Sequence, residues 1–166
     1  MLDYIHLLMN YSRWAHHKTW DCLATVSDED FGKPIPYSVG SLHQQMVHVM
    51  WAEDLWFSRV HQLPRPDHSH LTLPRRTDVR AAWDAVEGRW KAYVDGITEE
   101  ELNRVVTFMR GNGEQLNFPV WQIIVHMVNH GTDHRGQILR IVHDMGGETF
   151  EQDMFFYLRE QQFTSQ

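Results

Sequence analysis

The chain has little cysteine and no long apolar segment. Its single cysteine, Cys22, cannot form an internal disulfide, and it excludes a metal site built from several cysteines. No run approaches the roughly 18 apolar residues that a membrane-spanning helix needs. The start of the sequence also lacks the basic and apolar stretches of a signal peptide. We therefore expect a protein of the reducing cytoplasm that does not enter a membrane.

Positive charge is also scarce. Fifteen Lys and Arg residues stand against 22 Asp and Glu, which gives a net charge of −7 with neutral histidines. Because nucleic-acid binding requires a basic surface, this balance argues against a nucleic-acid partner. No Lys/Arg cluster indicates a basic tail or a membrane-surface patch. A small-molecule substrate is the expected partner.

Apolar residues recur at helical spacing through most of this 166-residue chain, of which 42% is hydrophobic. That content is enough to fill the core of a single domain, residues 1–166. The spacing predicts four long helices and a short C-terminal one, over about 2–25, 41–61, 77–96, 119–146 and 151–160. We therefore expect an all-α protein built as a four-helix bundle.

Polar residues and prolines mark the expected helix ends. Ser41 fits an N-cap, and Gln44 three residues later fits its capping-box partner. Thr77 is the expected N-cap of the next helix, and Pro119 suits the first turn of the last long one. The acidic break and the prolines of residues 27–36 predict a loop.

Two connections have distinct compositions. Residues 62–76 contain three prolines and no periodic pattern, which predicts a long link that permits a crossover between helices. Residues 105–109 and 116–118 flank a Gly-Asn-Gly sequence. This arrangement predicts a small β-hairpin, although an irregular loop fits the same residues.

Three histidines follow one another at four-residue intervals in the last long helix. His126, His130 and His134 therefore lie on one side of that helix. Two neutral imidazoles one turn apart can bind the same divalent cation. Three cannot reach one ion from a straight helix, because the first and third are about 12 Å apart along its axis. The predicted ligand pair is His130 and His134, and His126 is expected to line the pocket or support the ligands.

A third ligand is expected from a neighbouring helix. His48 is the preferred candidate because it lies among apolar positions of the helix over 41–61, whereas His43 is expected near the exposed start of that helix. Three nitrogen ligands would leave a position for water or substrate. Nitrogen donors suit zinc, nickel, iron and copper, so these residues leave the identity of the metal open.

These residues also have simpler interpretations. A single histidine is more often a surface or hydrogen-bonded core residue than a metal ligand, and a bundle without metal is an alternative. His61, His68 and His70 belong to the proline-rich link, where solvent-exposed side chains are expected. Cys22 is expected in the core rather than as a nucleophile, because no base or cation is identifiably placed beside it.

Two charged residues fall on apolar helix faces. Glu53 interrupts the stripe of the helix over 41–61, and Arg135 interrupts that of the last long helix. Because a lone buried charge is costly, a direct Glu53–Arg135 contact is one hypothesis, and side chains that reach solvent are the other. Gly131 lies on the same apolar face as Arg135, where it would let another helix approach closely.

Several segments together resemble the DinB-like family of small metal-binding helical bundles. They are Tyr11–Ala15, Leu23–Pro36, Gly40–Trp56, His126–Gln137 and Phe155–Leu158. The third segment is similar to the family's second helix, with Gly-Ser, His and Ala-Glu in order. The fourth is similar to its motif of three histidines followed by Arg-Gly-Gln. The resemblance is spread over most of the chain.

The resemblance implies an up-down-down-up bundle that is usually a homodimer. It implies a divalent metal ion bound by His48, His130 and His134. We expect Zn²⁺ or Ni²⁺ first, with Fe²⁺ and Mn²⁺ as alternatives. The family includes transferases that use bacillithiol or mycothiol, a maleylpyruvate isomerase and members without known activity. A low-molecular-weight thiol is therefore a further expected cofactor.

The first functional expectation is a metal-dependent thiol transferase or hydrolase that acts on a small molecule. His126, Trp51 and Gln44 are expected to shape its pocket. His17, at a position where relatives often carry another polar residue, is a candidate to support the ligands. The alternative is a non-catalytic metal-binding module of a stress response. The sequence identifies no general base.

Overall fold

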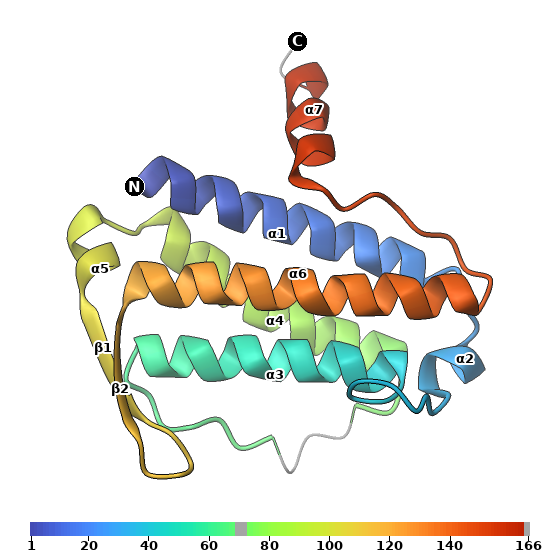
Figure 1. The fold of residues 1–166 in the computed structure, drawn as a ribbon, viewed down its shortest axis with the longest axis horizontal. Coiled ribbons are helices and arrows are strands. Elements are labelled where there is room, and N and C mark those ends of the chain that lie inside the picture. The colour runs from blue at the N-terminus through green and yellow to red at the C-terminus, as the bar shows by residue number, and fades with distance from the viewer. Residues whose placement is uncertain (69–72, 165–166) are drawn as a thin grey trace.

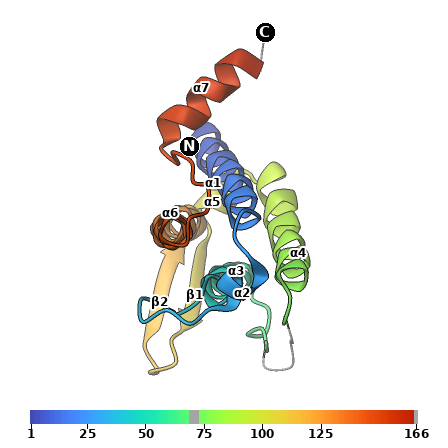
Figure 2. The same ribbon diagram turned by 90° about the vertical axis from the view of Figure 1, so that its right-hand side faces the viewer.

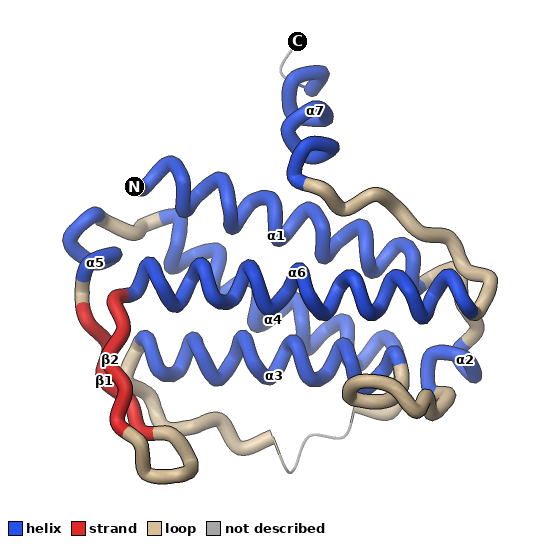
Figure 3. The backbone as a smooth tube through the Cα atoms, in the orientation of Figure 1, coloured by secondary structure: helices blue, strands red, loops and turns tan. Residues whose placement is uncertain are grey.

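The computed structural model describes residues 1–68 and 73–164 and contains four long helices. These are α1 (Leu2–Leu23), α3 (Leu42–Val60), α4 (Arg76–Asp95) and α6 (Val120–Asp144). Three shorter helices are α2 (Asp28–Gly32), α5 (Glu99–Asn103) and α7 (Met154–Thr164), and the two strands are β1 (Val105–Met109) and β2 (Gln115–Pro119). Figure 3 shows that helix dominates the chain.

The four long helices form an up-down-down-up bundle, which confirms the predicted fold class. Figure 1 shows α1 and α6 running in one direction and α3 and α4 in the other. Helix α6 packs against α1 and α3, and α4 packs against the same two helices from the other side. Figure 2, viewed along the bundle, shows the four helices around a common centre. Because α3 and α4 run in the same direction, the long link connects the end of α3 at one end of the bundle to the start of α4 at the other end.

The hairpin and the start of α3 agree with the sequence. Strands β1 and β2 pair antiparallel from Val105–Pro119 to Met109–Gln115. Their turn includes Gly113 at a φ of 84°, a conformation that glycine adopts without steric cost. Ser41 accepts a hydrogen bond from the Gln44 backbone N–H, and the Gln44 side chain accepts one from Ser41 N–H. This capping box fixes where α3 begins.

Other helix boundaries differ from the prediction. Residue Arg75, not Thr77, is the N-cap of α4, because the Asp78 carboxylate accepts from the Arg75 backbone N–H at 3.1 Å. Pro119 is the N-cap of α6 rather than a residue of its first turn. The predicted loop over 27–36 contains helix α2, which Ser27 caps.

The bundle core is apolar apart from a small number of polar side chains. Its fully buried side chains include Ile5, Leu23, Leu42 and Trp90. Arg135 is also in this group, with only 1% of its surface exposed. Within the described residues, no helix is both long and apolar enough to cross a membrane.

At Gly131 of α6, the His16 side chain of α1 comes close to the helix backbone. A Cβ atom at this position would lie 3.2 Å from Nε2 of His16 and 3.0 Å from Nη1 of Arg135. These distances are shorter than ordinary contacts of a methyl group, so a larger residue would push the His16 ring away. The expected close helix approach at Gly131 is therefore present.

Candidate metal centre

Three of the predicted histidines converge between α3 and α6. One ring nitrogen each of His48, His130 and His134 lies within 4.8 Å of the other two. The ring centroids are 4.7 Å apart for His48 and His134, 5.5 Å for His48 and His130, and 4.5 Å for His130 and His134. The structure thus brings together the group that could hold a metal ion.

The helical scaffold explains this convergence. His130 and His134 are one turn apart on α6, so their side chains project in the same direction. His48 faces them from α3, which packs directly against α6. Two nitrogens bound to one zinc ion at about 2.1 Å in tetrahedral geometry are about 3.4 Å apart. Small side-chain rotations would bring the three rings to that spacing.

Gln45 orients the His134 ring. Its side chain is fully buried, and its Oε1 lies 2.9 Å from Nδ1 of His134. An amide oxygen only accepts, so His134 donates from Nδ1 and keeps Nε2 for another partner. Gln45 Nε2 in turn donates to Gln137 Oε1 at 3.2 Å, and Gln137 Nε2 donates to Asp133 Oδ2 at 3.1 Å. This chain of hydrogen bonds fixes both amide orientations.

The electrostatic environment favours the neutral forms of His130 and His134. Burial, together with His134, His48 and His126, lowers the pKa of His130 to about 4. Burial and the neighbouring His48 also lower the pKa of His134. A neutral imidazole has a free lone pair, which is the form that binds a metal ion. The donor set therefore fits a divalent transition metal.

His126 lies one turn further along α6, outside the three-histidine group. Its ring centroid is 6.0 Å from that of His130 and 5.0 Å from that of Trp56. It lines a cavity of about 570 Å³ between α3, the hairpin and the start of α6. Trp51 and Gln44, the other expected pocket residues, do not line this cavity.

His43 and His17 lie outside the three-histidine group and contact other parts of the protein. His43 contacts the backbone oxygen of Leu73 through Nε2 at 2.6 Å, so it packs against the link. His17 binds Glu87 on α4 at 3.0 Å and is half exposed, so the structure does not bring it to the three-histidine group.

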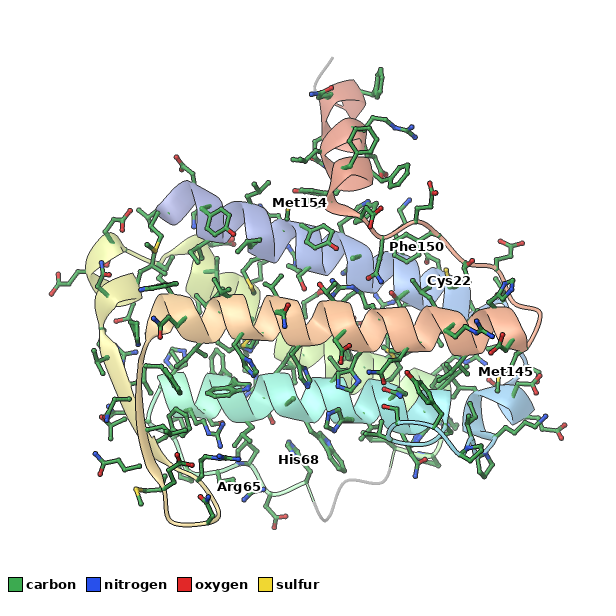
Figure 4. The ribbon with its side chains drawn as sticks, in the orientation of Figure 1. Cys22, Arg65, His68, Met145, Phe150 and Met154 are labelled. Atoms are coloured by element: carbon green, nitrogen blue, oxygen red, sulfur yellow. The ribbon has the colours of Figure 1, made fainter. Side chains whose placement is uncertain are left out.

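The link histidines differ from one another. Figure 4 shows Arg65 and His68 in the link beside α3. His68 stacks on Trp51 with ring centroids 4.9 Å apart, and its Nε2 is 2.8 Å from Asp54. The prediction of a solvent-exposed loop side chain is therefore wrong for His68. His61 is exposed, and His70 lies outside the described residues.

The hypothesis of a direct Glu53–Arg135 contact is wrong, because an imidazole stands between the two groups. Arg135 Nη1 is 3.0 Å from Nε2 of His16, and the other ring nitrogen of His16 is 4.0 Å from Glu53 Oε1. Arginine only donates, so Nε2 accepts, and Nδ1 carries the proton directed at Glu53. His16, which sequence reasoning missed, thus joins α1 to α3 and α6.

Burial shifts the ionisation of this buried group. It raises the pKa of Glu53 to about 8, with a further contribution from Glu87 and an opposing one from Arg135. Burial and the Arg135 charge lower the pKa of His16. Arg135 also donates to Thr132 at 2.8 Å and to Ser12 at 3.3 Å. The cation is therefore held mainly by neutral acceptors.

Comparison with known proteins agrees with this architecture. The model of the DinB family matches residues 1–164. Protein DinB of Bacillus subtilis (strain 168) is 22% identical over 166 residues, which cover 95% of each chain.

Solved structures show the same fold. A conserved protein of Enterococcus faecalis superposes with a TM-score of 0.65 at 18% identity, over 82% of this chain and 94% of that one. A DinB-like protein of Bacillus subtilis gives 0.63 at 14% identity, over 87% and 95%. A DinB-like protein of Bacillus cereus gives 0.61 at 18% identity, over 87% and 94%.

The raised pKa of Glu53 predicts a pH-dependent stability. Between pH 5 and 8 the folded chain holds a proton on Glu53 that the unfolded chain has released, so rising pH favours unfolding. Glu53→Gln should remove a slope on the order of 1 kcal/mol per pH unit within this range. Urea unfolding of the chelator-treated protein at pH 5, 6.5 and 8 measures the difference. The exposed Glu151→Gln is the control, and equal slopes in all three proteins would contradict the assignment.

The Gln45–His134 hydrogen bond predicts a loss of metal affinity in Gln45→Leu. Leucine fills a similar volume but leaves Nδ1 of His134 without its acceptor, so the ring loses its orientation. Affinity for Zn²⁺, measured by competition with a chromophoric chelator, should fall about 10- to 100-fold. Gln45→Glu keeps an acceptor oxygen and should retain most of the affinity. Equal losses in both variants would show that the hydrogen bond does not position the ring.

Proposed function

Since this chain belongs to the DinB family, we propose that His48, His130 and His134 bind one divalent metal ion in a metal-dependent enzyme. The substrate is a small molecule, and the reaction is a thiol transfer or a hydrolysis. The observation that carries the proposal is the convergence of three imidazoles from two packed helices, where the pKa values of His130 and His134 are lowered.

The composition of the group favours catalysis over a purely structural role. Within the described part of the chain, no fourth His, Cys, Asp or Glu joins the three histidines. Structural zinc sites have four protein ligands, whereas catalytic ones have three and an open position. A bound metal would lower the pKa of a thiol or water at that position. Zn²⁺ and Ni²⁺ are the first candidates because imidazole suits both, and Fe²⁺ and Mn²⁺ are the alternatives.

The protein's own groups would position the reactants. Gln45 accepts from Nδ1 of His134 and so leaves Nε2 of that ring free to bind a metal ion. His126 lies next to His130, and Trp56 packs on His126, on the side of the cavity where a substrate can approach. A low-molecular-weight thiol is the proposed second substrate. A non-catalytic metal-binding module is the alternative, and the response to thiols separates the two.

We further propose a homodimer, with α7 in the interface. Figure 2 shows that α7 projects away from the bundle. Tyr157 anchors it by packing on Tyr11 and Trp14 of α1. Figure 4 shows Phe150 and Met154 at the base of α7, next to α1. The opposite face exposes Phe155 and Phe163, at 64% and 72%. Such a face is typical of a contact between identical subunits.

The metal proposal predicts one divalent ion per chain. Protein purified without a metal-affinity tag should contain about one equivalent of zinc or nickel by elemental analysis. His130→Ala should lose it, because two remaining imidazoles bind far more weakly than three. His126→Ala should retain it, because that ring lies outside the group. Retention of metal in His130→Ala would contradict the assignment.

Co²⁺ can replace Zn²⁺ in such sites, and its visible spectrum reports which ligand occupies the open coordination position. The visible spectrum of the Co²⁺-loaded protein should change on addition of a small thiol if that position is accessible. An unchanged spectrum, with stoichiometric Co²⁺ retained, would favour the non-catalytic module.

The dimer proposal predicts a solution mass of twice the 19.7 kDa chain. Light scattering on Phe155→Ser/Phe163→Ser should give a monomer, because both substitutions remove exposed apolar surface from α7. Leu63→Ser, an exposed apolar residue of the link, is the matched control and should stay dimeric. A monomeric wild-type protein would rule out the dimer.

A further inference from the structure

The cavity beside His126 combines aromatic walls with positive charge. Its volume of about 570 Å³ lies in the range of small-molecule sites. Trp56 and Phe108 meet edge to face with ring centroids 5.3 Å apart, and Phe108 is 6.0 Å from Phe118. These rings come from α3, β1 and β2, so they form a continuous apolar surface for the body of a ligand.

Arg59 supplies the positive charge at these rings. Its guanidinium carbon lies 4.4 Å from the ring centroid of Trp56 and 4.4 Å from that of Phe108. Among the described residues, no carboxylate lies within the 4.0 Å of an ion pair with Arg59. Arg110, the other arginine of the cavity, is paired with Glu114 at 2.9 Å. Arg59 is thus a half-buried cation that lacks a counterion.

The surroundings of Arg59 make this charge unfavourable without a ligand. Burial lowers the pKa of Arg59, and the nearby Arg65 and Arg110 lower it further. The neighbouring His126 cannot supply a counterion either, because an imidazole is neutral or positively charged. An acidic chain with a net charge of −7 has many carboxylates that could have paired with it. A bound anion would supply the missing counterion.

The cavity adjoins the three-histidine group. His126 lines the cavity, and its ring is 6.0 Å from that of His130, one turn along α6. A small molecule can therefore occupy the cavity with one end and approach the three imidazoles with the other. Such a ligand needs an anionic group at the Arg59 end and an apolar or aromatic body against Trp56 and Phe108.

We propose that this cavity is the substrate site and that it selects an aromatic or apolar carboxylate, whose anionic group binds Arg59. The assignment of this ligand as the substrate rests on the proposed function, because the reaction would take place at the end of the molecule that lies beside His130. The binding itself requires only the cavity and Arg59. The role of Arg59 is to bind substrate and to set its orientation.

Calorimetric titration with 1-naphthoate tests the proposal, with the neutral 1-naphthalenemethanol as the matched ligand. The wild-type protein should bind the carboxylate at least tenfold more tightly, since a charge-assisted contact is worth about 1.5–3 kcal/mol. Arg59→Met keeps an apolar side chain over the rings and should remove this preference. Arg59→Lys keeps the charge and should retain part of it. Arg140→Met, which removes an exposed arginine of α6, should behave as wild type.

The outcomes separate this proposal from the metal assignment. His130→Ala should still bind 1-naphthoate with the same dependence on Arg59, even where elemental analysis finds no metal. Equal affinity for the acid and the alcohol would overturn the proposal, as would undiminished naphthoate binding in Arg59→Met. Absence of naphthoate binding to the wild-type protein at millimolar concentration would overturn it too. None of these results would affect the metal stoichiometry on which the proposed function depends.

Discussion

The packing of α6 between α3 and α1 is the constraint on which the rest of the structure depends. Helix α6 has two pairs of adjacent residues, 130–131 and 134–135. In each pair, the first residue faces α3 and the second faces α1. His130 and His134 face His48 on α3. Gly131 and Arg135 face His16 on α1. Since consecutive helical residues differ by about 100° in direction, one short sequence can build a ligand group and a helix contact.

A buried polar group of α1, α3 and α6 supports this arrangement. Arg135 is 1% exposed, and its hydrogen-bond partners are neutral: His16, Thr132, Gln152 and Ser12. Glu53, with a pKa raised to about 8, is largely protonated at neutral pH. The interior therefore contains few full charges besides the guanidinium, which limits the desolvation cost. The geometric requirements of the hydrogen bonds set the rotation of α1 relative to α6.

Sequence patterns predicted the features that depend on local spacing. The four long helices, the hairpin, the α3 capping box and the positions of His48, His130 and His134 follow from periodicity and from known helix-end chemistry. Helices α2 and α5 have five residues each, too few to show a period. His16 and Gln45 lie in helical phase with apolar neighbours, but their partners come from other helices. The contact of His68 with Trp51 likewise depends on how the link folds back.

X-ray absorption at the metal edge of the loaded protein tests the central claim most directly. The account predicts three imidazole nitrogens at about 2.0–2.1 Å and at least one further light atom from water or an added thiol. Addition of a small thiol should introduce a sulfur neighbour at about 2.3 Å. A spectrum with fewer than three imidazoles would contradict the convergence of α3 and α6 on one ion. A spectrum with four protein ligands and no exchangeable position would contradict the proposed chemistry.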